Sequence, residues 1–281
     1  MRVQEGDQSG PQQESIAQLR NAVYDTLKGD SFLATWCTES TLRRYLAART
    51  WNVQAATKML LNTLQWRQTY KPHEIKWEDI AVEATGKQFV MPVEDKAGRQ
   101  IVIMRPREER SSSTDGQIKF LVYTLEIASQ RADASGQGKL TWLVDMDGYS
   151  IRNAPSLRVS MQTLNILQSH YPERLGMAVC YHAPRLFSFS FKALQPFIDP
   201  ATSKKIQFVS RDNEAVLMPT MFPMHKMEAC LGGSGTYTYS SEEYSQLCKQ
   251  IETASGAPLQ QTQRSAWQIG EHGSHQQRSE S

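Results

Sequence analysis

The stretch from Tyr171 to Thr202 constrains the fold of this chain more than any other part of it. It reads YPERLGMAVCYHAPRLFSFSFKALQPFIDPAT. A proline-marked turn is followed by the apolar run Leu175–Tyr181, which predicts a buried strand. Pro184 then stands where a helix would begin, since a proline in the first helical turn gives up no hydrogen bond. We therefore expect a strand and then a helix here.

The helix expected over Pro184–Ile198 carries apolar residues on two sides. A first stripe is made by Phe187, Phe191, Leu194 and Ile198, and a second stripe by Leu186, Phe189, Ala193 and Phe197. A helix at a protein surface normally has a single apolar face. The pattern therefore indicates either a helix buried in the core or one that meets a second apolar partner.

The motifs YPER, AP, F-x-x-L-x-P-F-I-D-P-x-T and K-I, in this order, resemble the Sec14-like (CRAL-TRIO) lipid-transfer family. The resemblance extends from about Thr38 to about Tyr244. It implies that the Phe-rich helix is a movable gate over a lipid-binding cavity. The gate and cavity residues implied in this way are Phe187, Phe189, Phe191, Leu194, Phe197, Ile198, Leu140 and Trp142.

The resemblance and the local patterns together predict four parts of the chain. Residues 1–13 are expected to be flexible, and residues 14–70 to form a helical segment of the CRAL-TRIO N-terminal type, with Thr38 and Asn52 as helix caps. Residues 71–254 are expected to form the CRAL-TRIO lipid-binding domain. Residues 255–281 hold little to bury, which predicts a disordered tail.

Short apolar runs alternate with helical patterns through the predicted lipid-binding domain. Phe89–Val93 and Ile101–Met104 predict a hairpin, and further strands are expected at Leu140–Val144, Met177–Cys180 and Ile206–Val209. This order predicts an α/β fold with a mostly parallel sheet and flanking helices.

Helices are expected between these strands and after them. One follows the polar loop Ser111–Gly116, and one begins at Pro155 with Leu157 on its inner side. Glu214–Leu217 predicts one helical turn before an irregular Met-rich stretch, and a last helix is expected to begin at Glu242.

Net charge, apolar run length and cysteine spacing limit the classes of function that the chain can have. The net charge of +2 over 281 residues gives no reason to expect nucleic acid as a partner. No apolar run approaches the ~20 residues that span a bilayer, and the first residues lack the apolar core of a signal peptide. Four dispersed cysteines favour reduced thiols. We expect a soluble, cytoplasmic monomer that associates transiently with membrane surfaces.

An enzymatic alternative arises at the end of the central strand. Asp145-Met146-Asp147-Gly148 matches the D-x-D-G pattern of haloacid-dehalogenase-like phosphatases, in which paired aspartates attack phosphorus and hold Mg²⁺. The downstream run Ser210–Glu214 supplies only a weak candidate for the remaining acids such an enzyme needs. The other interpretation is that both aspartates tie down the following loop. Cys180 and His182 lack a second ligand pair, so no metal site is expected.

The resemblance also implies a lipid headgroup site. Residue by residue, the positions used by inositol-phospholipid members fall on Arg49, Glu173, Thr202 and Lys205. Arginine and lysine pair with phosphate oxygens, and glutamate and threonine bond hydroxyl groups. Bulky Leu140 and Trp142 stand where phosphatidylcholine-exchanging members carry small hydroxyl side chains, so the counter-lipid stays open.

The sequence therefore predicts a lipid carrier rather than an enzyme. We expect it to bind one phospholipid, phosphatidylinositol, without any cofactor, and to exchange it with membranes or present it to lipid-modifying enzymes such as lipid kinases. Two alternatives stay open: a sensor of the same fold that holds another hydrophobic ligand, and a module that docks partners through its Gln-rich tail.

Overall fold

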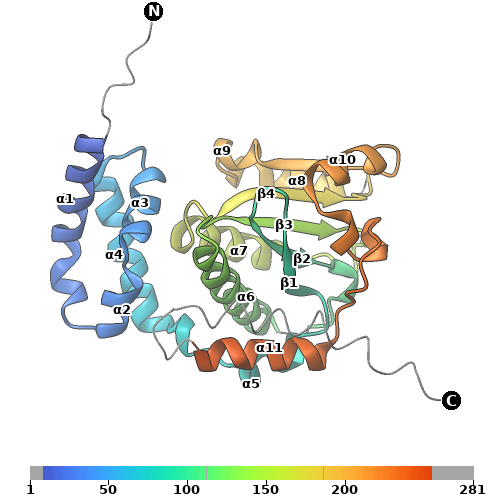
Figure 1. The fold of residues 1–281 in the computed structure, drawn as a ribbon, viewed down its shortest axis with the longest axis horizontal. Coiled ribbons are helices and arrows are strands. Elements are labelled where there is room, and N and C mark those ends of the chain that lie inside the picture. Colours follow the sequence, from blue (N-terminus) through green and yellow to red (C-terminus); the bar gives the residue numbers. More distant parts are fainter. Residues whose placement is uncertain (1–8, 112, 186, 255–281) are drawn as a thin grey trace, which may run out of the picture. The chain divides into compact units, whose positions relative to one another are not determined.

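The computed structural model describes residues 9–111, 113–185 and 187–254 (Figure 1). The chain divides into two units. The first comprises Met1–Pro72 and Leu164–Glu173, and the second His73–Thr163 and Arg174–Ser281. The predicted flexible residues 1–8 and the predicted disordered tail 255–281 lie outside the described residues.

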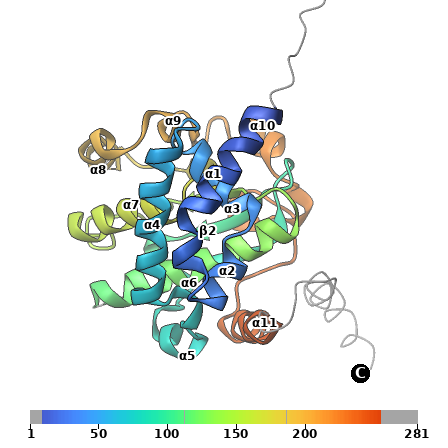
Figure 2. The same cartoon turned by 90° about the vertical axis from the view of Figure 1, so that its left-hand side faces the viewer.

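The first unit is built mainly from four helices, three of which the apolar spacing of the sequence predicts. They are α1 (Ser9–Leu27), α2 (Ser31–Trp36), α3 (Glu39–Ala47) and α4 (Val53–Tyr70), and α1 packs against α3 and α4 (Figure 2). The predicted caps are confirmed. The Thr38 hydroxyl accepts a hydrogen bond from the Thr41 amide at 3.3 Å, and the Asn52 side chain accepts one from the Ala55 amide at 2.9 Å.

Two features of this unit differ from the prediction. Helix α1 begins at Ser9 rather than at residue 14, and Pro11 fits its first turn because no helical hydrogen bond is required there. Helix α2 was not expected, since its six residues are too few to show a periodicity. Asp30 caps it by accepting a hydrogen bond from the Leu33 amide at 3.0 Å.

The end of α7 (Leu157–His170) belongs to the first unit and places His170 among aromatic side chains. The imidazole stacks on Trp66 with 4.2 Å between ring centroids, and its Nδ1 lies 3.1 Å from the Thr63 hydroxyl. Burial, reinforced by the positive charge of Arg67, lowers the pKa of His170 to about 4. This histidine therefore stays neutral at neutral pH.

The second unit contains the predicted sheet. Its strands are β1 (Gln88–Glu94), β2 (Gln100–Met104), β3 (Leu140–Asp145), β4 (Leu175–Tyr181) and β5 (Ile206–Val209), in that order across the sheet. The pair β1–β2 is antiparallel and the other three pairs are parallel. The predicted hairpin, the strands and the α/β class are confirmed.

Helices join and flank the strands. Helix α6 (Thr114–Ala134) lies against β1, β2 and β3, whereas α8 (Phe187–Leu194), α9 (Pro200–Ser203) and α10 (Glu214–Met221) lie towards β4 and β5 (Figure 1). The second unit also contains the first part of α7, the short α5 (Trp77–Ile80) and the C-terminal α11 (Ser241–Ala254). Tyr244 of α11 is buried, and its hydroxyl accepts a hydrogen bond from the Val90 amide at 3.1 Å.

Three helices depart from the sequence-based expectation. The Phe-rich helix is shorter than Pro184–Ile198, because Pro196 has no amide hydrogen and the α-helix ends two residues before it. Helix α10 continues to Met221 although Pro219 lies inside it. Leu157 does not face inward, since 63% of it is exposed, whereas its neighbour Val159 is buried. None of the described helices has the length and apolarity needed to cross a membrane.

The neutral state of His170 predicts a pH-dependent stability. The folded pKa of about 4 lies below the unfolded value of about 6.5, so only the unfolded state binds a proton between these pH values. The free energy of unfolding should therefore fall by about 1–2 kcal/mol as pH drops from 7 towards 4.5, after discounting for partial solvent access. The expected loss should be absent in His170→Phe.

Urea unfolding followed by tryptophan fluorescence measures this effect, because Trp66 stacks on the imidazole. His225→Phe, at an exposed position, is the control and should keep the wild-type pH dependence. An unchanged pH dependence in His170→Phe would contradict the assignment.

Candidate functional site

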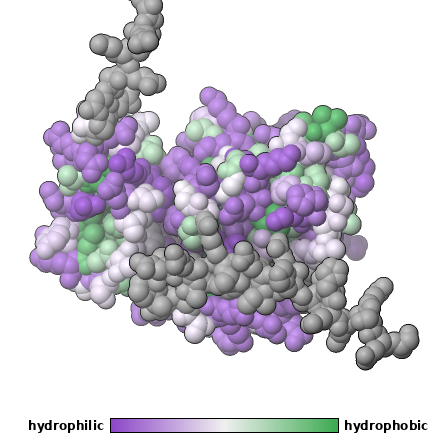
Figure 3. All heavy atoms as spheres, viewed as in Figure 1, coloured by the Kyte–Doolittle hydropathy of each residue, from purple (hydrophilic) through white to green (hydrophobic). Residues whose placement is uncertain are grey.

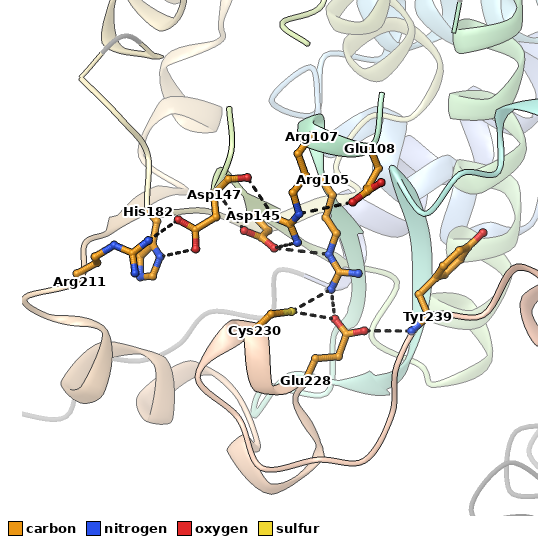
Figure 4. Close-up of polar contacts among 10 residues, drawn as sticks. All are labelled: Arg105, Arg107, Glu108, Asp145, Asp147, His182, Arg211, Glu228, Cys230 and Tyr239. Carbon is orange, nitrogen blue, oxygen red and sulfur yellow. Dashed lines mark hydrogen bonds and ion pairs between the residues drawn. The ribbon is translucent and has the colours of Figure 1, made fainter. Parts of the chain in front are cut away.

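Asp145, the last residue of β3, is held by two arginines at the carboxyl end of the sheet (Figure 4). Its carboxylate is 1% exposed and lies 2.7 Å from the Arg107 guanidinium and 3.5 Å from that of Arg105. Hydrogen bonding to Asp145 raises the pKa of Arg107 despite its partial burial. The contacts tie the end of β3 to the segment that follows β2.

Arg105 extends this contact to the C-terminal part of the unit. Its guanidinium forms a buried ion pair with Glu228 and lies 5.2 Å from the centroid of the Phe89 ring. Glu228 also accepts a hydrogen bond from the Tyr239 amide at 3.2 Å (Figure 4). A buried carboxylate thus meets a cation and an amide, which offsets the cost of removing it from water.

Asp147 belongs to a second polar group at the same edge (Figure 4). Its carboxylate lies 3.0 Å from Nδ1 of His182 and 2.6 Å from the Arg211 guanidinium. Nε2 of His182 lies 2.6 Å from Glu214. Hydrogen bonds from Tyr181 and His182 lower the pKa of Glu214. The group borders a cavity of about 360 Å³ that is also lined by Tyr149 and Pro184.

These contacts favour the structural interpretation of the D-x-D-G motif. Asp145 is occupied by Arg105 and Arg107, while Asp147 is shared between Arg211 and His182. Among the described residues, no group of three or more His, Cys, Asp or Glu side chains is arranged to hold a metal ion. Burial raises the pKa of Cys180 to about 12, so its thiol is protonated at neutral pH.

The opposite edge of the sheet has a basic cavity of about 500 Å³. Its charged lining consists of Lys96, Arg99, Lys204 and Lys205, with Gly176, Met177 and Thr220 among its other walls. Arg99 pairs with the buried Asp95 at 2.7 Å. This volume falls within the range of small-ligand pockets, roughly 300–1,000 Å³. The lining residues carry more positive than negative charge, so the cavity suits an anionic group.

The predicted headgroup residues fall in both units. Thr202 lies in α9, and Lys205 precedes β5, where its Nζ donates a hydrogen bond to the Leu175 carbonyl at 3.0 Å. In the first unit, Arg49 is exposed in the turn after α3, and Glu173 occupies a turn with a φ of 59°. Thr202 and Lys205 therefore belong to the second unit, and Arg49 and Glu173 belong to the first. The assignment of all four residues to one headgroup remains a prediction.

Three cationic residues of the cavity were missed by the sequence analysis. Lys96 and Arg99 belong to the β1–β2 turn, and Lys204 directly precedes the predicted Lys205. The sequence feature that could have indicated Lys96 and Arg99 is the predicted hairpin turn, which carries both cations. The parallel pairing of β2, β3, β4 and β5 brings the segments that precede β2 and β5 to the same edge of the sheet.

Helix α8 packs one side against the sheet and leaves apolar surface outside. The ring of Phe191 meets Phe208 of β5 edge-on at 5.7 Å, and Phe187 meets Tyr149 at 5.7 Å. Leu194 and Ile198 are half-buried, and Phe197 is 53% exposed. The Phe189 side chain lies outside the described part of the structure.

Two other predicted cavity residues lie inside the sheet. Leu140 and Trp142 are buried in β3. Trp142 is in register with Val102 of β2 and Ala178 of β4. Their indicated role in a lipid cavity stays a prediction, because sheet packing accounts for their burial equally well.

Comparison with known proteins identifies the family. Residues 84–233 match the family model of the CRAL/TRIO domain, and residues 15–62 match that of the CRAL/TRIO N-terminal domain. The chain belongs to the CRAL-TRIO family. This confirms the resemblance inferred from the sequence, and it makes the chain a member of a family of lipid-binding and lipid-transfer proteins.

Individual relatives agree with this family. A CRAL-TRIO domain-containing protein of Schizosaccharomyces pombe is 34% identical over 219 residues, which cover 76% of this chain and 21% of that protein. The phosphatidylinositol transfer protein PDR17 of Saccharomyces cerevisiae is 35% identical over 187 residues, covering 62% of this chain and 53% of that protein. The chain thus spans about a fifth and about half of these two CRAL-TRIO relatives.

The fold agrees with a solved structure. The crystal structure of Sfh5 superposes with a TM-score of 0.64 at 14% identity, and the match covers 91% of this chain and 100% of that chain. At this identity the likeness shows the fold alone. It confirms a CRAL-TRIO sheet with flanking helices that is preceded by a helical segment.

The buried ion pairs predict a stability effect for Asp145→Asn. Removing this carboxylate takes the closest anionic partner from Arg107 and leaves Arg105 with Glu228 alone, so the free energy of unfolding should fall by about 1–3 kcal/mol. Asp147→Asn, at a more exposed position, should cost less than about 1 kcal/mol. Chemical denaturation measures both changes.

Adding Arg107→Gln to Asp145→Asn should recover part of the loss, because one unpaired cation is removed. If Asp145→Asn leaves stability unchanged and instead abolishes a metal-dependent phosphatase activity, the structural role of Asp145 is wrong.

Proposed function

We propose that this protein binds one phosphatidylinositol and either exchanges it between membranes or presents it to a lipid-modifying enzyme. The observation that carries the proposal is the basic cavity of about 500 Å³ around Lys205, a residue assigned to the headgroup from sequence alone. The function named for PDR17, phosphatidylinositol transfer, supports the choice of lipid.

The cavity suits the polar end of a phospholipid. Ammonium and guanidinium groups from Lys96, Arg99, Lys204 and Lys205 surround it, and charge-assisted hydrogen bonds to phosphate oxygens are stronger than neutral ones. Thr202 lies close in sequence, and its hydroxyl suits an inositol hydroxyl group. Arg49 and Glu173 belong to the first unit and are kept as headgroup candidates on the sequence resemblance alone.

The acyl chains would lie under helix α8. The apolar residues Phe187, Phe191 and Leu194 would line the lipid side in the closed state, and the exposed Phe197 would meet the membrane as the helix swings outward. No covalent bond is made or broken in this cycle, and no cofactor takes part. We propose residues 14–70 as the helical segment of the CRAL-TRIO N-terminal type. Residues 71–254 are the proposed lipid-binding domain.

The proposed setting is the cytoplasm, with transient attachment to membranes. Cys37, Cys180 and Cys248 are buried free thiols and Cys230 is an exposed one, which fits a reducing compartment. We propose a monomer with phospholipid as ligand and lipid kinases as candidate partners. A sensor that holds another hydrophobic molecule is the nearest alternative within the same fold.

Mass spectrometry of lipids that co-purify with the protein from a eukaryotic host tests the proposal. We expect near-stoichiometric phosphatidylinositol. Lys204→Ala/Lys205→Ala should lower the affinity for phosphatidylinositol by at least about 100-fold and reduce its occupancy and transfer, since hydrogen bonds to charged groups contribute about 1.5–3 kcal/mol each. Lys119→Ala, on the exposed side of α6, is the matched control and should keep full occupancy.

Two results would decide against this function. A different hydrophobic molecule at near-stoichiometric level would leave the fold and the gate but assign the protein to the sensor alternative. Equal phosphatidylinositol occupancy in the lysine variant and in its control would remove the basic cavity from the headgroup site.

A further inference from the structure

The segment from the end of β3 to the first turn of α7 presents apolar side chains to solvent. Ile151 is 76% exposed and Leu157 is 63% exposed, whereas Met146 before them and Val159 after them are buried. Single exposed apolar residues are common on protein surfaces and need no explanation. Two large ones within one short connection, bounded by buried neighbours, indicate a contact surface.

This segment has an ordered turn rather than a loose loop. Gly148 adopts a φ of 73°, a conformation that glycine allows without strain. The Asn153 side chain donates a hydrogen bond to the Gly148 carbonyl at 2.9 Å and accepts one from the Ser150 amide at 2.8 Å. Ile151 lies inside this clamped turn. Little conformational entropy is therefore lost when the turn binds a partner.

The charge of the segment is entirely positive. No aspartate or glutamate occurs between Asp147 and Glu173, while Arg152 and Arg158 are both exposed. Within the described residues neither arginine forms an ion pair. Arginines that flank protruding apolar side chains suit a bilayer interface, where the apolar groups enter the acyl boundary and the guanidinium groups stay at anionic headgroups.

The segment lies beside the N-terminal end of α8. Tyr149 meets Phe187, the first residue of that helix, with perpendicular rings at 5.7 Å. Arg185, just before the helix, is exposed and adds to the same positive charge. Figure 3 shows a further apolar area at the upper right, where Figure 1 places α10, and Val216 of that helix is 70% exposed.

We propose that residues 148–158 form a membrane-docking turn that inserts Ile151 and Leu157 into an anionic bilayer next to α8. This inference rests on the proposed function in one respect, since it assumes that the protein visits membranes to exchange its lipid. A bilayer fits better than a protein partner, because a stable protein interface buries at least about 1,000 Å² and needs more than two apolar side chains on a narrow turn.

Vesicle co-sedimentation of the full chain tests the proposal. The probes are phosphatidylcholine vesicles with and without phosphatidylserine. We expect wild-type protein to bind the phosphatidylserine vesicles, and Ile151→Asp/Leu157→Asp to bind them at least about tenfold more weakly, because each buried aliphatic side chain contributes about 1.5–3 kcal/mol. Val82→Asp is the matched control, since Val82 is an exposed apolar residue elsewhere in the unit (86%) and should bind as wild type.

A charge variant tests the electrostatic part. Arg152→Gln/Arg158→Gln should lose about fivefold in affinity per arginine for the phosphatidylserine vesicles and little for pure phosphatidylcholine. Lys119→Gln/Lys249→Gln removes the same charge from α6 and α11 and should change neither.

Lipid occupancy of the purified variants separates this inference from the proposed function. The docking variants should keep wild-type occupancy of the bound lipid and lose only vesicle binding and transfer. Wild-type vesicle binding by Ile151→Asp/Leu157→Asp would overturn the docking turn, and so would loss of its bound lipid, which would place the turn in the cavity or fold. Loop-dependent vesicle binding by a protein that carries no phosphatidylinositol would uphold the turn and overturn the proposed ligand.

A protein partner is the remaining occupant of this surface. If the wild-type chain fails to bind both kinds of vesicle, while Ile151→Asp/Leu157→Asp loses a stoichiometric protein complex, the membrane assignment is wrong.

Discussion

The second unit depends on charges that are buried at the carboxyl end of its sheet. Asp145 holds Arg105 and Arg107, and Arg105 in turn reaches Glu228 (Figure 4). Strand β3 and the segments after β2 and before α11 are fixed relative to one another in this way. Such ion pairs give little net stability compared with apolar packing, but removing one member is costly because its partner is left charged and dry. The network therefore fixes geometry.

This rigid edge contrasts with the helix that follows β4. Helix α8 is held to the sheet by ring contacts such as Phe191 with Phe208, and Phe197 in the short turn that follows it is exposed. These ring contacts bury apolar surface and no charge, which supports the outward movement proposed for the helix. A firm frame beside an apolar helix fits the gate that we propose.

The two edges of the sheet differ in the charged residues that they carry. The edge with Lys96, Arg99 and Lys205 has a basic cavity, which we propose as the headgroup site, whereas the edge with Asp145 and Asp147 has its carboxylates paired with arginines. The D-x-D-G motif looks catalytic when it is considered alone, because paired carboxylates on a strand end are typical of phosphatases. Its neighbours in space, which are distant in sequence, favour a structural role.

The sequence by itself determined the fold class, the strand order along the chain, the caps Thr38 and Asn52, and the family. These features rest on local periodicity, on capping chemistry and on a motif with fixed spacing, all of which are present in neighbouring residues. It also indicated Lys205, because that position belongs to the family motif.

Only the tertiary structure decided which side chains meet. Parallel strands bring segments that are distant in sequence to one edge of the sheet. This arrangement decides which residues line the basic cavity with Lys205, which arginines contact Asp145 and that Leu157 is exposed. Helix ends were decided partly by proline, which shortened α8 but was accommodated inside α10. Periodicity indicates that a residue lies on a face, but packing and charge pairing across the fold decide what that face contacts.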